Sequence, residues 1–224
     1  MPRPSHFEMS VSRAAAESAC FAIPGSGCCS ASRRSQVQYT GDNLIAEPLV
    51  SLTHAITIDR PARNVWPWLS QMGAGSRAGW YSYDVLDNGR QRSEERIVPE
   101  LQHLARGMVF PALPGVTDCF TLLAFEPERY LILGWRPNDT LVMTWAFVLN
   151  EMTSSSCRLV VRAREGASYH FHALPRWLTS RIGPTVHFIM QRKQLLGIKR
   201  RAESTLADAL MPADHSRTAE KGAA

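Results

Sequence analysis

The first group of residues suited to ligand binding is an aromatic cluster, Trp80, Tyr81 and Tyr83. It follows a glycine-rich loop over residues 73–79. Aromatic side chains beside such a loop either anchor a core or line a pocket for a flat apolar ligand, with their phenol groups supplying hydrogen bonds. The loop has the wrong glycine spacing for a phosphate cradle, and it follows an expected helix rather than a strand. We interpret it as a mobile connection whose glycines permit positive φ.

A second group of polar residues lies in the longest periodic segment of the chain, residues 184–210. At about 100° per residue, His187, Gln191 and Gln194 project on one stripe with apolar residues, namely Phe188, Leu195, Ile198, Ala202, Leu206 and Ala209. A polar group that faces a core must find a partner or incur a cost of roughly 1 to 3 kcal/mol. A wet or ligand-filled cavity would satisfy these groups, although His187 by itself is also typical of a hydrogen-bonded core histidine.

Three side chains are candidates for moving or stabilising a proton, namely His187, Tyr83 and Arg162. No nucleophile has a recognisable base beside it. His170 and His172 have the i, i+2 spacing of some zinc ligands, but no third ligand follows at a telling distance. We therefore expect neither a metal nor a cofactor.

The elements that must position these residues begin with a half-buried strand over Leu52 to Asp59, where Ile56 and Ile58 share one face. A helix with Pro67 in a tight or kinked first turn follows, and Gly73 stops it. Two short helical pieces are expected next, over Tyr83 to Asn88 and Ile97 to Leu104.

A strand-rich half follows these helical pieces. Its strands are predicted at Met108 to Pro111, Phe120 to Glu126, Tyr130 to Arg136, Leu141 to Met152 and Cys157 to Arg164. Turn signals between the later strands predict antiparallel pairing, and Trp145 and Phe147 then share the large apolar face of one strand. The helix expected over residues 184–210 is roughly 40 Å long and a sheet of six or seven strands is roughly 30 Å wide, so the helix can cover the concave side.

Length and composition favour one domain with flanking segments. Of the 224 residues, we assign 1–40 to a flexible N-terminal arm, 41–210 to the domain and 211–224 to a flexible tail. The net charge of +5 comes almost entirely from scattered arginines, which argues against a nucleic-acid partner. No apolar run is long enough for a membrane span, and five cysteines without a disulfide or zinc spacing fit a reduced cytoplasm.

Several motifs resemble the bacterial SRPBCC family, the START-like and polyketide cyclase/dehydrase-like proteins. They are Ala55-Ile56-Thr57-Ile58-Asp59, Val65-Trp66-Pro67-Trp68-Leu69, Gln71-Met72-Gly73, Gly79-Trp80-Tyr81-Ser82-Tyr83-Asp84, Arg96-Ile97-Val98-Pro99-Glu100-Leu101 and Gly197-Ile198-Lys199-Arg200-Arg201-Ala202-Glu203. The resemblance implies an α+β helix-grip fold of the START/Bet v 1 type. In that fold a curved antiparallel sheet wraps around a long C-terminal helix, and two short helices follow the first strand.

The family includes lipid and hormone carriers and aromatic polyketide cyclases, and no catalytic signature is shared across it. We expect binding of a small hydrophobic or aromatic molecule between the sheet and the C-terminal helix. The expected ligand-binding residues are Trp80, Tyr81, Tyr83, Trp145, Phe147, His187, Gln191 and Gln194. The alternatives are a metal-free cyclase or dehydratase-like enzyme using the same cavity, and a stress-related or regulatory protein that acts through protein contacts. The sequence is also compatible with a homodimer.

Overall fold

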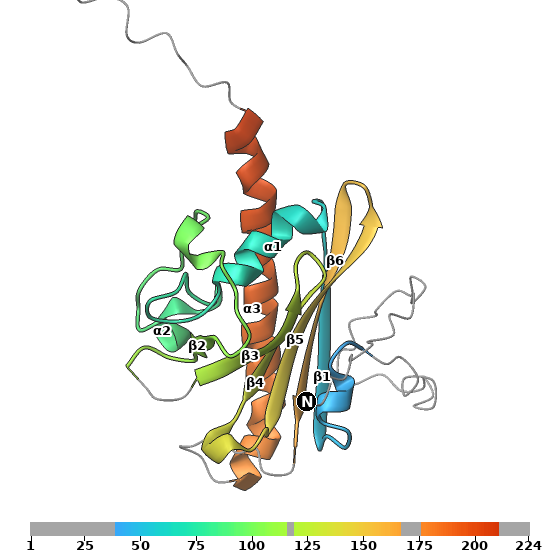
Figure 1. Cartoon of the computed structure of the whole chain (residues 1–224). Coiled ribbons are helices and arrows are strands. Elements are labelled where there is room, and N and C mark those ends of the chain that lie inside the picture. Colours follow the sequence, from blue (N-terminus) through green and yellow to red (C-terminus); the bar gives the residue numbers. More distant parts are fainter. Residues whose placement is uncertain (1–38, 116–118, 167–175, 211–224) are drawn as a thin grey trace, which may run out of the picture.

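A six-stranded antiparallel sheet forms the body of the protein, in the order β1-β6-β5-β4-β3-β2 (Figure 1). The computed structural model describes residues 39–115, 119–166 and 176–210, and the side chains of the last segment over residues 185–204. The strands are β1 (Val50–Ile58), β2 (Val109–Pro111), β3 (Cys119–Glu126), β4 (Tyr130–Trp135), β5 (Met143–Thr153) and β6 (Ser156–Glu165). Every pair of neighbouring strands is antiparallel, which confirms the pairing that the turn signals predicted for the later strands.

Three helices complete the domain: α1 (Ala62–Gln71), α2 (Asp84–Asp87) and α3 (Arg176–Leu210). Short 3-10 turns lie at η1 (Asp42–Leu44), η2 (Pro99–Leu101) and η3 (Pro137–Asp139). Figure 1 shows that α3 runs along the sheet and that α1 crosses α3. This is the predicted α+β helix-grip architecture.

Two helix predictions need correction. The C-terminal helix begins at Arg176 rather than at Pro184, so Gly183 and Pro184 lie inside it. Proline removes one backbone donor, and the hydrogen bonds of the turns on either side keep the helix continuous. The helical piece expected over Ile97 to Leu104 is only the 3-10 turn η2, which begins at Pro99.

The core lies between the concave face of the sheet and α3. Phe147 on β5 pairs in register with Val161 on β6, and both are buried. From the helix, Leu195, Ile198 and Ala202 are buried against this face, as the helical stripe predicted. Phe188 departs from the prediction because 38% of its surface is exposed.

Several sequence predictions lie outside the described residues. They concern residues 1–38 of the arm, the tail over 211–224, the pair His170 and His172, and the side chains of Leu206 and Ala209.

Candidate functional site

Aromatic rings from three segments meet on the concave face of the sheet. The ring of Trp145 on β5 lies 5.2 Å from Trp80, 5.0 Å from Phe147 and 5.4 Å from Phe120, centroid to centroid. Trp80 and Phe147 are buried, whereas Trp145 and Phe120 remain partly exposed. The cluster therefore contains Trp80, Trp145 and Phe147 of the predicted ligand-binding set, and its surface is incompletely covered at Trp145.

The predicted polar stripe of α3 faces this cluster. The indole Nε1 of Trp145 donates a hydrogen bond of 3.0 Å to Gln191 Oε1, and Gln191 Nε2 donates one of 2.7 Å to Gln194 Oε1. Gln194 Nε2 in turn lies 3.9 Å from the Met72 sulfur. Both glutamines are 2% exposed. They thus satisfy one another and fix the orientation of the Trp145 ring, so their inward position does not itself require a cavity.

Two histidines lie side by side at the edge of the same face. His187 on α3 and His54 on β1 have ring centroids 5.7 Å apart, at an interplanar angle of 35°. The Nε2 atom of each ring is buried and has no hydrogen-bond partner. Burial, with a smaller contribution from His54, lowers the pKa of His187 to about 4, and burial also lowers the pKa of His54. Both rings are therefore neutral at pH 7.

His54 is a functional candidate that our sequence analysis missed. It lies on β1 at the alternation that places Ile56 and Ile58 toward the core. The signal was present in the sequence, because residues two and four positions apart on a strand share a face. The proximity of His54 to His187 could not be predicted from the sequence, since the two residues come from opposite ends of the domain.

Tyr81 and Tyr83 occupy different environments despite their proximity in sequence. Tyr81 is buried between α1 and α3, where its hydroxyl donates to the Trp68 carbonyl at 3.2 Å and its ring lies 4.5 Å from the Arg201 guanidinium carbon. Burial raises its pKa. Tyr83 is 40% exposed, with the Lys193 ammonium nitrogen 5.9 Å from its ring centroid. Tyr81 thus holds the helices together, and Tyr83 lies away from the concave cluster.

Arg162, a predicted proton-handling candidate, lies on the opposite side of the sheet. Its guanidinium pairs with Asp42 at 2.7 Å and donates to Thr53 Oγ1 at 2.6 Å. Its neighbours in sequence, Val161 and Ala163, point into the core, so the strand alternation directs Arg162 outward. Arg162 therefore holds the N-terminal 3-10 turn against the convex face and does not reach the concave cluster.

The glycine-rich loop is held in place by its own arginine. Arg77 Nε donates to the Met72 carbonyl at 2.5 Å, a second guanidinium nitrogen donates to Ser70, and the guanidinium carbon lies 4.0 Å from the Phe110 ring centroid. Gly73 and Gly79 pair with each other across the loop, and both have positive φ. These contacts oppose the mobility that we expected of the loop.

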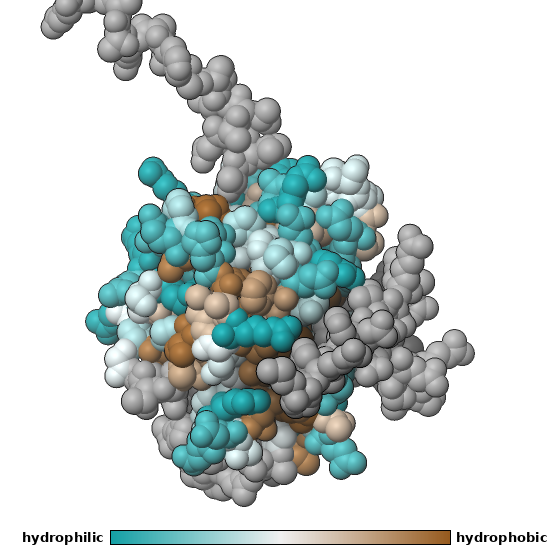
Figure 2. Space-filling model, viewed as in Figure 1, coloured by the Kyte–Doolittle hydropathy of each residue, from teal (hydrophilic) through white to brown (hydrophobic). Residues whose placement is uncertain are grey.

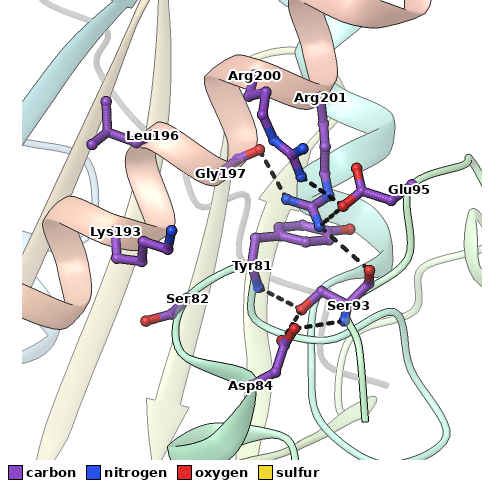
Figure 3. A pocket seen from close by; sticks show the side chains of 10 residues that line it. All are labelled: Tyr81, Ser82, Asp84, Ser93, Glu95, Lys193, Leu196, Gly197, Arg200 and Arg201. Atoms are coloured by element: carbon purple, nitrogen blue, oxygen red, sulfur yellow. Dashed lines mark hydrogen bonds and ion pairs between the residues drawn. The ribbon is translucent and has the colours of Figure 1, made fainter. Parts of the chain in front are cut away.

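A separate surface pocket of about 250 Å³ lies beside α3 (Figure 3). It is lined by Tyr81, Ser82, Asp84, Ser93, Glu95, Lys193, Leu196, Gly197, Arg200 and Arg201. Its charged groups largely pair with one another. Glu95 accepts from Arg200 at 2.6 Å and from Arg201 at 2.8 Å, and Asp84 accepts from the Ser93 hydroxyl at 2.5 Å. We interpret this pocket as the junction that fastens the loop around Ser93 to α3.

Within the described ranges, no three His, Cys, Asp or Glu side chains are grouped so that they could hold a metal ion. The same part of the chain has no helix that is long and apolar enough to cross a membrane.

Comparison with known proteins gives structural matches of low sequence identity, of which three are described below. No protein-family model matches the sequence, and no curated protein matches it. The Zhui aromatase/cyclase from a Streptomyces species is 14% identical, with a TM-score of 0.47 over 71% of this chain and 97% of that chain. A protein from Mesorhizobium loti is 14% identical, with a TM-score of 0.44 over 70% and 98% of the two chains.

A Polyketide_cyc-like protein from Corynebacterium glutamicum is 13% identical, with a TM-score of 0.37 over 75% of this chain and 97% of that chain. These likenesses concern the fold alone. The order of strands and the helix along the concave face are those that the sequence motifs implied. The chain therefore has the α+β helix-grip fold, with an antiparallel sheet and a long C-terminal helix along it.

Proposed function

We propose that this protein binds a small hydrophobic or aromatic molecule on the concave face of the sheet, between β5 and α3. The observation that carries the proposal is the partial exposure of Trp145, a large ring that points inward and is oriented by Gln191. Phe120, in ring contact with it, is partly exposed as well. Covering such rings with an apolar ligand removes their surface from water, and a flat ligand can stack on them.

The enzyme alternative, a cyclase or dehydratase-like activity in the same place, depends on His187. Of the three predicted proton-handling groups, His187 lies nearest the concave cluster, whereas Tyr83 lies on the surface and Arg162 faces the convex side. His187 is neutral and can therefore accept a proton, but its pKa of about 4 makes it a weak base near pH 7. A replacement of His187 that leaves turnover of a polyketide-type substrate unchanged would remove this alternative.

The alternative of a protein that acts through protein contacts is favoured by α2. Val85 and Leu86 expose 66% and 63% of their surface there. The face of the molecule in Figure 2 also shows hydrophobic residues exposed among hydrophilic ones. Three further predictions rest on the sequence alone. They are a cytoplasmic location, the lack of a nucleic-acid partner and a homodimer.

The binding proposal predicts a selective effect of removing the Trp145 ring. Trp145→Leu is expected to weaken the binding of naphthalene about tenfold, because the ligand loses a stacking surface worth roughly 1 kcal/mol or more. Equilibrium dialysis of the full chain with naphthalene measures this affinity. Trp66→Leu is the matched control, since Trp66 lies on α1 and stacks on Phe125 at 6.5 Å, away from the cluster.

Equal losses of affinity in Trp145→Leu and Trp66→Leu would contradict a site at Trp145, as would an unchanged affinity in Trp145→Leu. Native mass spectrometry of the full chain purified from its own host would identify a natural ligand as a co-purifying small molecule.

A further inference from the structure

We infer that the bound molecule carries a neutral hydroxyl group, as a phenol or aromatic alcohol does, and that His54 and His187 bind this hydroxyl together. The inference rests on the proposed function and names the chemical class of its ligand.

The first argument is the hydrogen-bonding state of the two rings. His54 Nε2 and His187 Nε2 are both buried and both lack a partner, although their ring centroids are only 5.7 Å apart. A buried polar atom without a partner is costly, and neighbouring pairs of such atoms are uncommon in folded proteins. Two adjacent unsatisfied nitrogens indicate that a polar group from outside the chain completes them.

The second argument is that the other polar groups on this side of α3 are already satisfied. Gln191 accepts from Trp145 and donates to Gln194, so neither the indole nitrogen nor the Gln191 amide calls for a ligand. Among the described side chains that line this part of the concave face, the buried atoms without a hydrogen-bond partner are the Nε2 atoms of the histidine pair. One wall of that pair is apolar, since the Phe188 ring lies 5.6 Å from the His54 ring.

The third argument concerns charge. Burial disfavours the protonated form of both rings, and the nearby His54 further lowers the pKa of His187. No ion pair between described residues includes either histidine. A carboxylate ligand would bring a buried charge that two neutral imidazoles cannot neutralise, whereas a neutral ligand brings no charge. The pair therefore favours an uncharged polar group.

A hydroxyl can serve two neutral imidazoles in more combinations of their tautomers than a carbonyl oxygen can. In a neutral imidazole one nitrogen is a donor and the other an acceptor. A hydroxyl donates one hydrogen bond and accepts others, so it can serve one Nε2 atom that accepts and another that donates. A carbonyl oxygen can only accept, and an apolar ring leaves both nitrogens unsatisfied.

The test compares 2-naphthol with naphthalene, which has the same rings and no hydroxyl. Wild-type protein is expected to bind 2-naphthol about tenfold more tightly than naphthalene, measured by equilibrium dialysis of the full chain. His54→Leu and His187→Leu should each abolish most of this preference, so that each variant binds 2-naphthol about as tightly as it binds naphthalene. His103→Leu, at an exposed histidine, is the control and should keep the full preference.

A second measurement uses the wild-type chain and does not depend on the folding of a variant. Addition of 2-naphthol should shift the imidazole nitrogen resonances of His54 and His187 in ¹⁵N NMR spectra, and naphthalene should not shift them in the same way.

The outcomes separate the two proposals. If wild type binds naphthalene as tightly as 2-naphthol, the histidine assignment is overturned and the proposed function stands. The same holds if the preference persists in both histidine variants. If neither probe binds, the proposed function fails, and the present inference fails with it.

Discussion

Gly197→Ala is expected to lower the free energy of unfolding by about 2 to 3 kcal/mol, even though alanine is the better helix former. A β-carbon at position 197 would lie 2.2 Å from the backbone oxygen of Tyr81 and 3.0 Å from its Cβ. Backbone cannot move aside as a flexible side chain does, and Tyr81 is itself held at a φ of 60°. The steric cost therefore exceeds the gain in helix propensity, which is about 1 kcal/mol.

Chemical denaturation with urea measures this loss, and thermal unfolding should show a midpoint lower by roughly 5 to 10 °C. Arg192→Ala is the matched control, because Arg192 is exposed on the same helix and should change stability by less than about 0.5 kcal/mol. Increased stability of Gly197→Ala would show that α3 does not approach the Tyr81 backbone as closely as described.

Acid is expected to destabilise the protein through His187. Its pKa is about 4 in the folded chain and about 6.5 when unfolded, so between these values the unfolded state binds a proton that the folded state does not. Protonation of this residue therefore leaves the free energy of unfolding unchanged above about pH 6.5 and lowers it as the pH decreases toward 4. The difference in pKa corresponds to roughly 3 kcal/mol.

The measurement must compare wild type with His187→Leu, because Asp87 titrates with the opposite sign. Burial and nearby Asp84 raise the pKa of Asp87 to about 6, so its folded form binds a proton more readily than its unfolded form. Urea unfolding at a series of pH values should show similar stabilities near pH 7. Near pH 4, wild type should have lost roughly 3 kcal/mol relative to the variant. Parallel pH profiles for the two proteins would contradict a buried neutral His187.

The fold was largely predictable from local patterns. Strand β1 was predicted to begin at Leu52 and is found to begin at Val50, two residues earlier. The strand itself was predictable because the alternation of apolar residues indicates which side chains a strand buries. The start of α3 was predicted wrongly, since Gly183 and Pro184 are typical of helix boundaries and are here accommodated inside the helix. A breaker residue has a local preference, and the packing of a long helix along a sheet can override it.

The candidate site was only partly predictable. The sequence indicated that Trp145 and Gln191 both face inward, but not that one donates to the other. Arg162 shows the reverse error. Its alternation with Val161 already placed it on the outer face, and we still considered it for chemistry because an arginine suits that role in isolation.

The amino-acid sequence by itself determined the order of the elements and the inward or outward direction of most side chains, because the helical and strand periods follow from local backbone geometry. Only the tertiary structure decided which inward residues meet. His54 and His187 become neighbours, and Gly197 lies against Tyr81, because the register of β1 in the sheet and the path of α3 along it bring distant segments together. Those approaches depend on packing across the whole domain, and no local pattern encodes them.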